Sequence, residues 1–447
     1  MQSELLKIAE AIVSQTVAGE QVEVVAVHGT ETDIRVYQGE IESFTAAESQ
    51  GVGIRVVQDG RQGMAYAGSL DTGVLNETLE EARDNASFGT PDEFQGIAEP
   101  DGVESVSLEL LDSSLADFAN EDKIALAIEL ESSILQSDSR IIGVESTDYV
   151  DSITTSAIVT STGIHRANQE GGCYVAASSL ASDGTDTQTG FGYSVGRSPT
   201  QLDVAKASSD ATEKATRLLG AKKAESGRMT VILDPYVTAQ FLGIIGSTLS
   251  GEALLKGRSL FADREGDQVA PNFLTLIDDP TDVDAFTATE ADGEGLASRR
   301  NTLIDKGALR GFLHNSYTAR ALGTSSTGSA VRSYNSSPGA GPLALMLTPG
   351  VHSQPELIAQ VGEGMLIQGV AGLHSGVNPV SGDFSAGAEG LMIRQGDLAE
   401  PVREVTVAST LQRMLLDIQN IGNDLERLPM KSSGVSIVVN DIMVSGV

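Results

Sequence analysis

The chain of 447 residues is long enough for two or three domains, each with its own core. Its formal net charge of -33 at pH 7 disfavours direct binding of nucleic acid, because neutralising phosphates requires clustered lysine and arginine side chains. Hydrophobic residues make up 40% of the sequence, and no run approaches the roughly 18 consecutive apolar residues of a membrane span, so we expect a soluble protein without membrane contact.

Cysteine usage and the first residues favour a cytoplasmic location. Cys173 is the only cysteine, which excludes an intrachain disulfide and a zinc site built from several thiolates. The N-terminus lacks a basic segment followed by an apolar run, so the sequence predicts no signal peptide.

Helices and strands alternate along the first half of the chain. The predicted elements are a helix at 3–13 with Ser3 as its cap, strands at 22–27, 33–37, 51–57 and 63–67, a helix at 74–88, a linker at 90–109, a helix starting at Asn120, strands at 141–146, 151–160, 171–179 and 190–195, and a helix at 204–218. The dipeptide Asp59-Gly60 predicts a hairpin. We therefore expect an N-terminal α+β domain of antiparallel strands flanked by helices. Duplication stays open, because no residue-level repeat supports it.

The second half is richer in glycine and in short strands. A polar segment at 221–228 indicates the boundary, so the predicted domains are 1–225 and 226–447. The predicted strands are 229–233, 310–313, 343–347, 365–370, 390–394 and 434–439, and the predicted helices are 237–255, 315–322, 353–360 and 407–418. This pattern indicates a β-rich C-terminal domain.

The sequence offers few catalytic patterns. A zinc peptidase holds its metal with two histidines on one helix face beside a glutamate, but the two histidines nearest in sequence here are His352 and His374. Residues 278–294 form an acidic run, and such carboxylates can hold Ca²⁺ or Mg²⁺. The spacing differs from an EF-hand, so a solvated loop is the better interpretation.

One glycine-rich stretch, residues 372–394, carries a specific resemblance. It resembles the C-terminal signature of the TldD/PmbA family, also called the modulator of DNA gyrase family, on its PmbA/TldE-like branch. Further similar segments follow the family's order, namely 51–63, 233–236, 256–261, 292–295, 311–317 and 422–424. The resemblance implies an N-terminal α+β domain, a β-rich C-terminal domain and a place in a peptide-processing metalloprotease complex.

The resemblance also identifies where the family's zinc motif would fall. TldD-like members carry His-Glu-x-x-x-His on a helix and a late cysteine, whereas this chain has Leu242, Gly243 and Ser247 at those positions and no cysteine at 428–434. These side chains can neither replace two imidazoles nor act as a general base. The resemblance therefore implies a chain with no catalytic residues, no metal and no cofactor, which is inactive alone.

The implied role is that of a subunit. We expect it to pair with a TldD-like catalytic subunit and to bind unfolded peptide, with a homodimer possible when it is alone. A sheet-rich domain can hold extended peptide through main-chain hydrogen bonds. The candidate contact residues are His374, Asn378, Ser381 and Asp383, with Asn315, Tyr317 and Arg320. Stabilising turns is an equally good interpretation of these residues. Two alternatives stay open: a stand-alone interaction protein, such as a gyrase modulator or scaffold, and a hydrolase with a carboxylate-bound metal.

Overall fold

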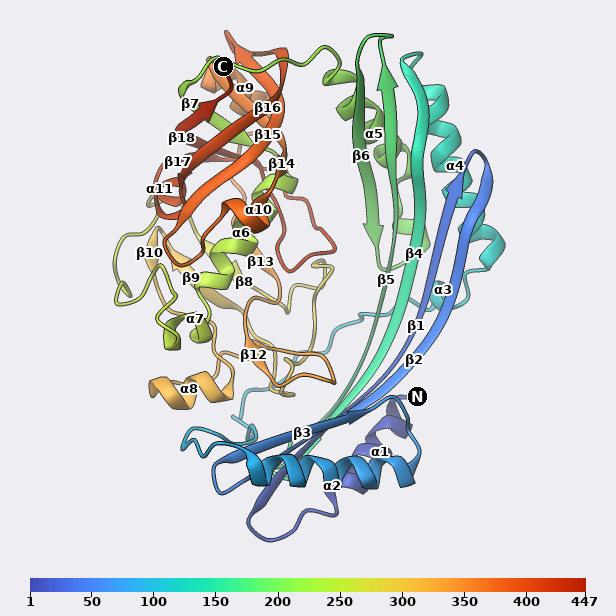
Figure 1. Cartoon of the computed structure of the whole chain (residues 1–447), viewed down its shortest axis with the longest axis vertical. Coiled ribbons are helices and arrows are strands. Elements are labelled where there is room, and N and C mark those ends of the chain that lie inside the picture. Colours follow the sequence, from blue (N-terminus) through green and yellow to red (C-terminus); the bar gives the residue numbers. More distant parts are fainter.

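The computed structural model describes all 447 residues, and its N-terminal half (residues 1–219) is built on one six-stranded antiparallel sheet. The strand order is β3-β2-β1-β4-β5-β6. The strands are β1 (Glu20–Tyr37), β2 (Glu40–Gln58), β3 (Arg61–Ala67), β4 (Ile141–Thr160), β5 (His165–Ser182) and β6 (Thr187–Gly196). Helices α1 (Gln2–Val13) and α2 (Thr72–Phe88) cover one end of the sheet, and α4 (Asn120–Ser137) and α5 (Val204–Arg217) cover the other (Figure 1). Two short helices, α3 (Ser113–Ala116) and η1 (Pro199–Gln201), complete this half.

The element order of this half occurs twice. A helix, three strands and a helix (α1-β1-β2-β3-α2) are followed by the same succession (α4-β4-β5-β6-α5), with only α3 between them. The first strands of the two units, β1 and β4, pair antiparallel at the centre of the sheet. The predicted α+β class with antiparallel strands is confirmed, and residues 90–109 form the predicted linker without helix or strand.

Several predicted strands are parts of longer ones. The segments 22–27 and 33–37 both belong to β1, and 141–146 and 151–160 both belong to β4. Residues 28–31 within β1 are partly exposed, whereas Thr147 and Tyr149 within β4 are fully buried, and the backbones of both stretches pair with neighbouring strands on both sides. Hydrophobic alternation reports burial and therefore misses the exposed stretch of β1. The hairpin at Asp59-Gly60 is confirmed, with φ of 51° and 70° at its two central residues.

The C-terminal half (residues 227–447) is β-rich, as predicted. Its main sheet has the order β16-β15-β14-β7-β18-β17, and an additional β16–β18 pairing closes a small barrel. These strands are β7 (Gly227–Leu233), β14 (Gly364–Ala371), β15 (Asp383–Arg394), β16 (Asp397–Thr410), β17 (Ile418–Ile421) and β18 (Ile437–Ser445). A second sheet contains β8 (Leu276–Asp278), β9 (Asn301–Asp305), β10 (Ala308–Leu309) and β13 (Leu345–Leu347), and β11 (Ala330–Val331) pairs with β12 (Gly339–Ala340).

Some element predictions in this half were wrong in detail. The predicted helix 237–255 is two helices, because Ser250 caps a new helix through Ala253 N. The predicted helix 407–418 starts only at Leu411, and the residues before it belong to β16. The helices are α6 (Pro235–Thr248), α7 (Gly251–Leu255), α8 (Ser316–Leu322), α9 (Gln354–Val361), α10 (Leu373–Gly376) and α11 (Leu411–Leu416).

The two halves face each other along the length of the molecule. Figure 1 shows β1, β2, β4 and β5 as long curved strands, with the C-terminal half along their concave side. Each half has its own apolar core, the largest of which lies in the C-terminal half around α6 and the barrel strands. No helix of the structure is long and apolar enough to span a membrane.

Candidate functional site

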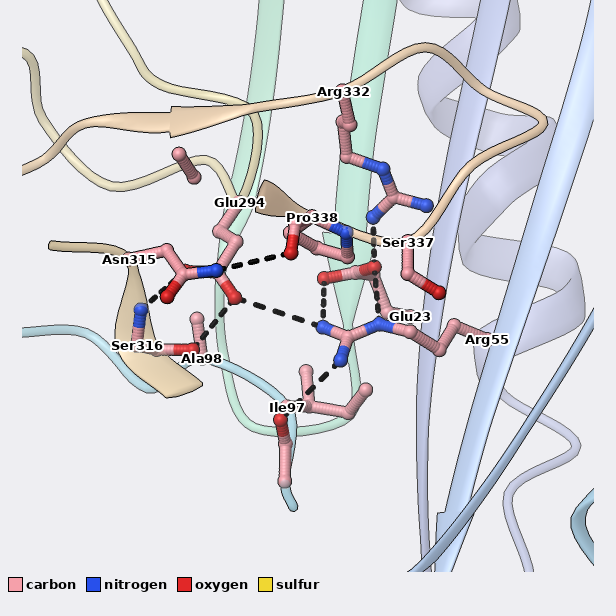
Figure 2. A network of polar contacts seen from close by, with 12 residues as sticks. Glu23, Arg55, Ile97, Ala98, Glu294, Asn315, Ser316, Arg332, Ser337 and Pro338 are labelled. Carbon is pink, nitrogen blue, oxygen red and sulfur yellow. Dashed lines mark hydrogen bonds and ion pairs between the residues drawn. The ribbon is translucent and has the colours of Figure 1, made fainter. Parts of the chain in front are cut away.

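A buried group of charged side chains lies where the two halves meet. Glu23 on β1 and Arg55 on β2 are direct cross-strand partners. Arg55 donates Nε to Glu23 Oε1 at 3.0 Å and Nη2 to Glu23 Oε2 at 2.9 Å. Arg332, which follows β11 in the C-terminal half, pairs with the same carboxylate (Figure 2). All three side chains are almost fully buried, and the carboxylate that Arg55 holds within the N-terminal half joins the C-terminal half through the guanidinium group of Arg332.

Electrostatics keep this group ionised. Burial alone would raise the pKa of Glu23, but Arg55 and Arg332 outweigh it and lower the pKa to about 2. Burial likewise works against the charge of Arg55, and Glu23 reverses the effect and raises the pKa of that guanidinium. The carboxylate of Glu23 and the guanidinium group of Arg55 therefore each stabilise the charged form of the other.

The network continues into the C-terminal half through Glu294. Its carboxylate lies 3.8 Å from Arg55 Nη2 and accepts hydrogen bonds from Ser316 N at 2.8 Å and Ser316 Oγ at 2.6 Å. Asn315 caps α8 by accepting from Thr318 N and donates Nδ2 to Pro338 O at 3.0 Å. Figure 2 shows these segments gathered around Arg55.

Glycines on β2 allow the close approach. A Cβ at Gly53 would overlap the carbonyl group of Tyr334, and one at Gly51 would overlap its ring. Gly295 has a φ of 78°, and a Cβ at this position would overlap Ile164 in the turn after β4. Gly51, Gly53 and Gly295 belong to segments quoted above for their resemblance, and their lack of a side chain permits contact between the halves.

Two cavities flank the network. The first, about 440 Å³, lies between the concave face of the sheet and loops of the C-terminal half, and Arg332 lines it. Its sheet side includes Val25, Val27, Ser152, Thr154, Ser156, Ile158, Arg166, Asn168, Glu170, Gly171 and Gly172, and Arg197 lines it from the residues directly after β6. Its other side includes Phe286, Thr289, Asp292, Tyr334, Leu343 and Lys431. The second, about 650 Å³, is lined by Arg55 and Glu294 together with Asp92, Lys256 and Tyr317.

The acidic run at 278–294 was wrongly predicted as a solvated loop. Asp278, Asp279, Asp292 and Glu294 are buried. Asp292 accepts from Glu294 N at 2.9 Å, Leu296 N at 3.0 Å and Ala330 N at 3.0 Å. Burial and the neighbouring Glu294 raise its pKa to about 7. These carboxylates hold loop backbones in place, which composition alone does not reveal.

Three of the sequence-predicted contact residues lie together on or beside α8. Tyr317 donates its hydroxyl to Asp92 at 2.8 Å and lines the larger cavity. Arg320 donates to the carbonyls of Phe94 at 2.8 Å and Gly96 at 2.9 Å. With the Asn315 cap, these side chains fasten α8 to the linker at 90–109.

The other four predicted contact residues form a separate exposed group. His374 lies in α10, and Asn378 accepts from Val380 N at 2.9 Å and Ser381 N at 3.2 Å. Ser381 donates to Asp383 Oδ2 at 2.7 Å. This group lines neither cavity, and Figure 1 shows α10 well apart from α8.

The positions assigned to the zinc motif lie on α6. Leu242 is fully buried, Gly243 has no side chain, and Ser247 donates its hydroxyl to Ile244 O at 2.7 Å. Ser432 donates to Ala239 O at 2.7 Å, which brings residues 428–434 beside the same helix. This set offers neither imidazole nor carboxylate, so it does not fit a zinc ion. No group of three or more His, Cys, Asp or Glu side chains in the structure is arranged to hold a metal.

Sequence reasoning missed Glu23, Arg55 and Arg332. The signal was present, because Glu23 and Arg55 are single charges inside the otherwise apolar segments 22–27 and 51–57. A charge in a buried strand requires a partner. Glu23 and Arg55 are such partners for each other, but the second partner of Glu23, Arg332, lies 309 positions away, and sequence spacing does not indicate it.

The fold is a six-stranded antiparallel sheet built from two similar units and joined to a small barrel, which defines a two-part α+β protein. Models of PmbA/TldA metallopeptidase domain 1, central domain and C-terminal domain match residues 22–86, 113–219 and 226–446. The chain belongs to the PmbA/TldD family, which confirms the resemblance stated above.

Relatives agree over nearly the whole chain. Metalloprotease PmbA of Escherichia coli O157:H7 is 25% identical, with 91% of this chain and 88% of that protein covered. The PmbA homolog of Haemophilus influenzae is 26% identical, covering 98% and 94%. A candidate modulator of a DNA gyrase from Thermotoga maritima superposes with a TM-score of 0.90 at 25% identity over 100% of both chains. TldE from Thermococcus kodakarensis has the same fold, with a TM-score of 0.89 at 21% identity over 99% of each chain.

Proposed function

We propose that this chain is the non-catalytic, TldE/PmbA-like subunit of a cytoplasmic TldD/TldE-type metalloprotease that processes or degrades unfolded peptides. The observation that carries the proposal is the chemistry of α6. Leu242, Gly243 and Ser247 provide no metal ligand and no general base where a TldD-like member carries them. The partner then supplies the metal and the base, and this chain supplies binding surface.

The cavities beside the buried network support a binding role. They are wide enough for a ligand of several residues, since ligand pockets typically measure about 300–1,000 Å³. Strands β1, β4 and β5 beneath the smaller cavity are internal to the sheet, so their backbone groups are already paired. A peptide in this cavity is recognised by side chains rather than by adding a strand.

The predicted contact residues divide between two tasks in this proposal. Tyr317, at the wall of the larger cavity, contacts peptide, while Asn315 and Arg320 hold α8 in position. His374, Asn378, Ser381 and Asp383 form an exposed surface that contacts the TldD-like partner. We place the boundary between the domains at residues 225–226.

The test is reconstitution with a TldD-like subunit. Cleavage of an unstructured peptide is measured for each chain alone and for the mixture, with size-exclusion chromatography of the same samples. We expect a heteromeric complex, activity in the mixture and none from this chain. Absence of both complex and stimulation contradicts the proposal. Elemental analysis of the dialysed chain gives an independent check: the proposal predicts far less than one equivalent of zinc.

A further inference from the structure

We propose that the 440 Å³ cavity binds the carboxylate groups of an extended acidic peptide; this inference rests on the peptide-binding role proposed above. The cavity is lined by four cationic side chains, Arg166, Arg197, Arg332 and Lys431, against two carboxylates, Glu170 and Asp292. In a chain of net charge -33, such a local excess of positive charge is unexpected. It selects for an anionic ligand.

Three of the four cations have donors to spare. Arg166 and Lys431 form no side-chain hydrogen bond or ion pair in the structure. Arg332 shares Glu23 through Nη1, but its Nη2 is buried without a partner, and its side chain is only 2% exposed. A buried guanidinium N–H without an acceptor is costly, so Arg332 brings an unsatisfied cationic group to the wall of the cavity. Arg197 differs, because it donates to backbone carbonyls such as Ala285 O at 2.8 Å and contributes charge alone.

The two carboxylates in the cavity, Glu170 and Asp292, compete only weakly with a ligand carboxylate for the cations. Asp292 accepts three backbone hydrogen bonds and has a raised pKa. Burial raises the pKa of Glu170, although Arg197 opposes that shift. Neither forms an ion pair with Arg166, Arg332 or Lys431, so Arg166 and Lys431 remain unpaired while Arg332 pairs only with Glu23.

The shape of the sheet face suits an extended chain. Lining residues on β5 run from Arg166 to Gly172, a length of about 20 Å at the usual rise per residue. Val25 on β1 lies opposite Ile158 on β4, which in turn lies opposite Arg166 on β5. Arg166 is therefore about 10 Å from β1. That strand carries Glu23, whose carboxylate pairs with Arg332. Arg166 and Arg332 therefore flank one end of the cavity, and Arg197 lies at the other through Gly171 O.

The overall charge of the chain does not exclude this ligand. Interactions between exposed charges more than about 8 Å apart are largely screened at physiological salt. The cations that line the cavity act at contact distance, where screening is weak. At physiological ionic strength, the side chains that line the cavity therefore determine which ligand binds, rather than the net charge of the chain.

The experiment uses the full chain and four synthetic octapeptides of glycine, serine and alanine. One carries four glutamates and an amidated C-terminus, one is neutral with a free C-terminal carboxylate, one is neutral and amidated, and one carries four lysines and is amidated. Binding is measured by calorimetry near physiological salt. The variants are Arg166→Ala, Arg166→Lys and Lys431→Ala, which leave the buried network intact. The control is Arg228→Ala, an exposed arginine on β7 outside both cavities.

We expect the glutamate peptide to bind at least tenfold more tightly than the neutral amidated and lysine peptides. Arg166→Ala and Lys431→Ala each weaken that binding at least threefold, Arg166→Lys weakens it less, and Arg228→Ala leaves it unchanged. If the free C-terminus binds instead and loses affinity in Arg166→Ala, the same carboxylate recognition holds with a terminal source.

Equal binding of all four peptides overturns the acidic preference while leaving the peptide-binding role intact. Absence of binding by any peptide, together with stimulation of a TldD-like partner, also overturns the inference alone. Absence of both binding and stimulation removes the proposed function as well.

Discussion

Replacing Glu23 by glutamine tests whether the buried charges hold the two halves together. The carboxylate lies between Arg55 and Arg332, where water has no access. Its pKa is lowered from 4.5 to about 2, which corresponds to about 3 kcal/mol of stabilisation in the folded state. Glutamine keeps the shape but leaves Arg332 without its counter-charge and Arg55 with only the more distant Glu294, at 3.8 Å. Breaking a buried pair in this way costs about 3–5 kcal/mol.

A matched control separates this effect from the loss of any negative charge. Glu363 pairs with Arg394 at 3.3 Å, but its side chain is 62% exposed. Exposed pairs of this kind contribute about 0–1 kcal/mol, so Glu363→Gln is expected to leave stability nearly unchanged. Both substitutions remove one carboxylate that pairs with arginine, but only Glu23 is buried.

The assay is urea unfolding followed by far-UV circular dichroism, since the chain has no tryptophan. Amide hydrogen exchange near Glu23 and Arg332 reports on the interface itself. We expect Glu23→Gln to lower the urea midpoint and to accelerate exchange in both segments. Because the pKa of Glu23 is lowered by folding, its stabilisation is present above about pH 4.5 and disappears as the pH falls through 2. A variant that unfolds at the same urea concentration as Glu363→Gln at pH 7 refutes the argument.

Three further substitutions test the surroundings of the network. Asp292→Asn removes a carboxyl whose pKa is raised by folding. Native protein should be stabilised as the pH falls from 8 to 5, and the variant, which also loses the carboxylate oxygen that accepts from Ala330 N, should gain less in urea titrations at the two pH values. Gly53→Ala forces a Cβ onto the Tyr334 carbonyl and should cost at least about 1–3 kcal/mol in urea unfolding, whereas Gly227→Ala, at a glycine with open space around it, should not. Tyr317→Phe removes the bond to Asp92 and should cost about 1 kcal/mol; an unchanged dissociation constant for peptide would contradict the contact role proposed for Tyr317.

Local signals in the sequence predicted the local parts of this fold. Apolar residues at helical spacing gave α1, with Leu5, Ala9 and Ile12 buried, and Asp59-Gly60 gave the β2–β3 turn. Both depend on neighbours within a few residues. The full length of β1 and β4 depends instead on hydrogen bonds to strands far away in sequence, and the partly exposed residues 28–31 within β1 carried no apolar signal.

The site was harder to predict, because it is assembled from distant segments. Arg55 meets Glu23 across a strand pair, but Arg332 and Glu294 reach them only after the two halves have packed together. The acidic residues at 278–294 were misread for the same reason. Composition counts their charges, whereas burial depends on the loop backbones that they bind.

The buried network explains why the interface has one arrangement. An apolar contact between the halves would tolerate sliding, since hydrophobic burial is non-directional. Glu23 accepts from two guanidinium groups, so any shift of the halves would leave a charge unpaired away from water. Arg332 belongs both to this network and to the wall of the 440 Å³ cavity. The pairing that fixes the halves therefore also fixes the position of an unsatisfied donor beside the proposed ligand, which links the stability of the interface to the specificity of the cavity.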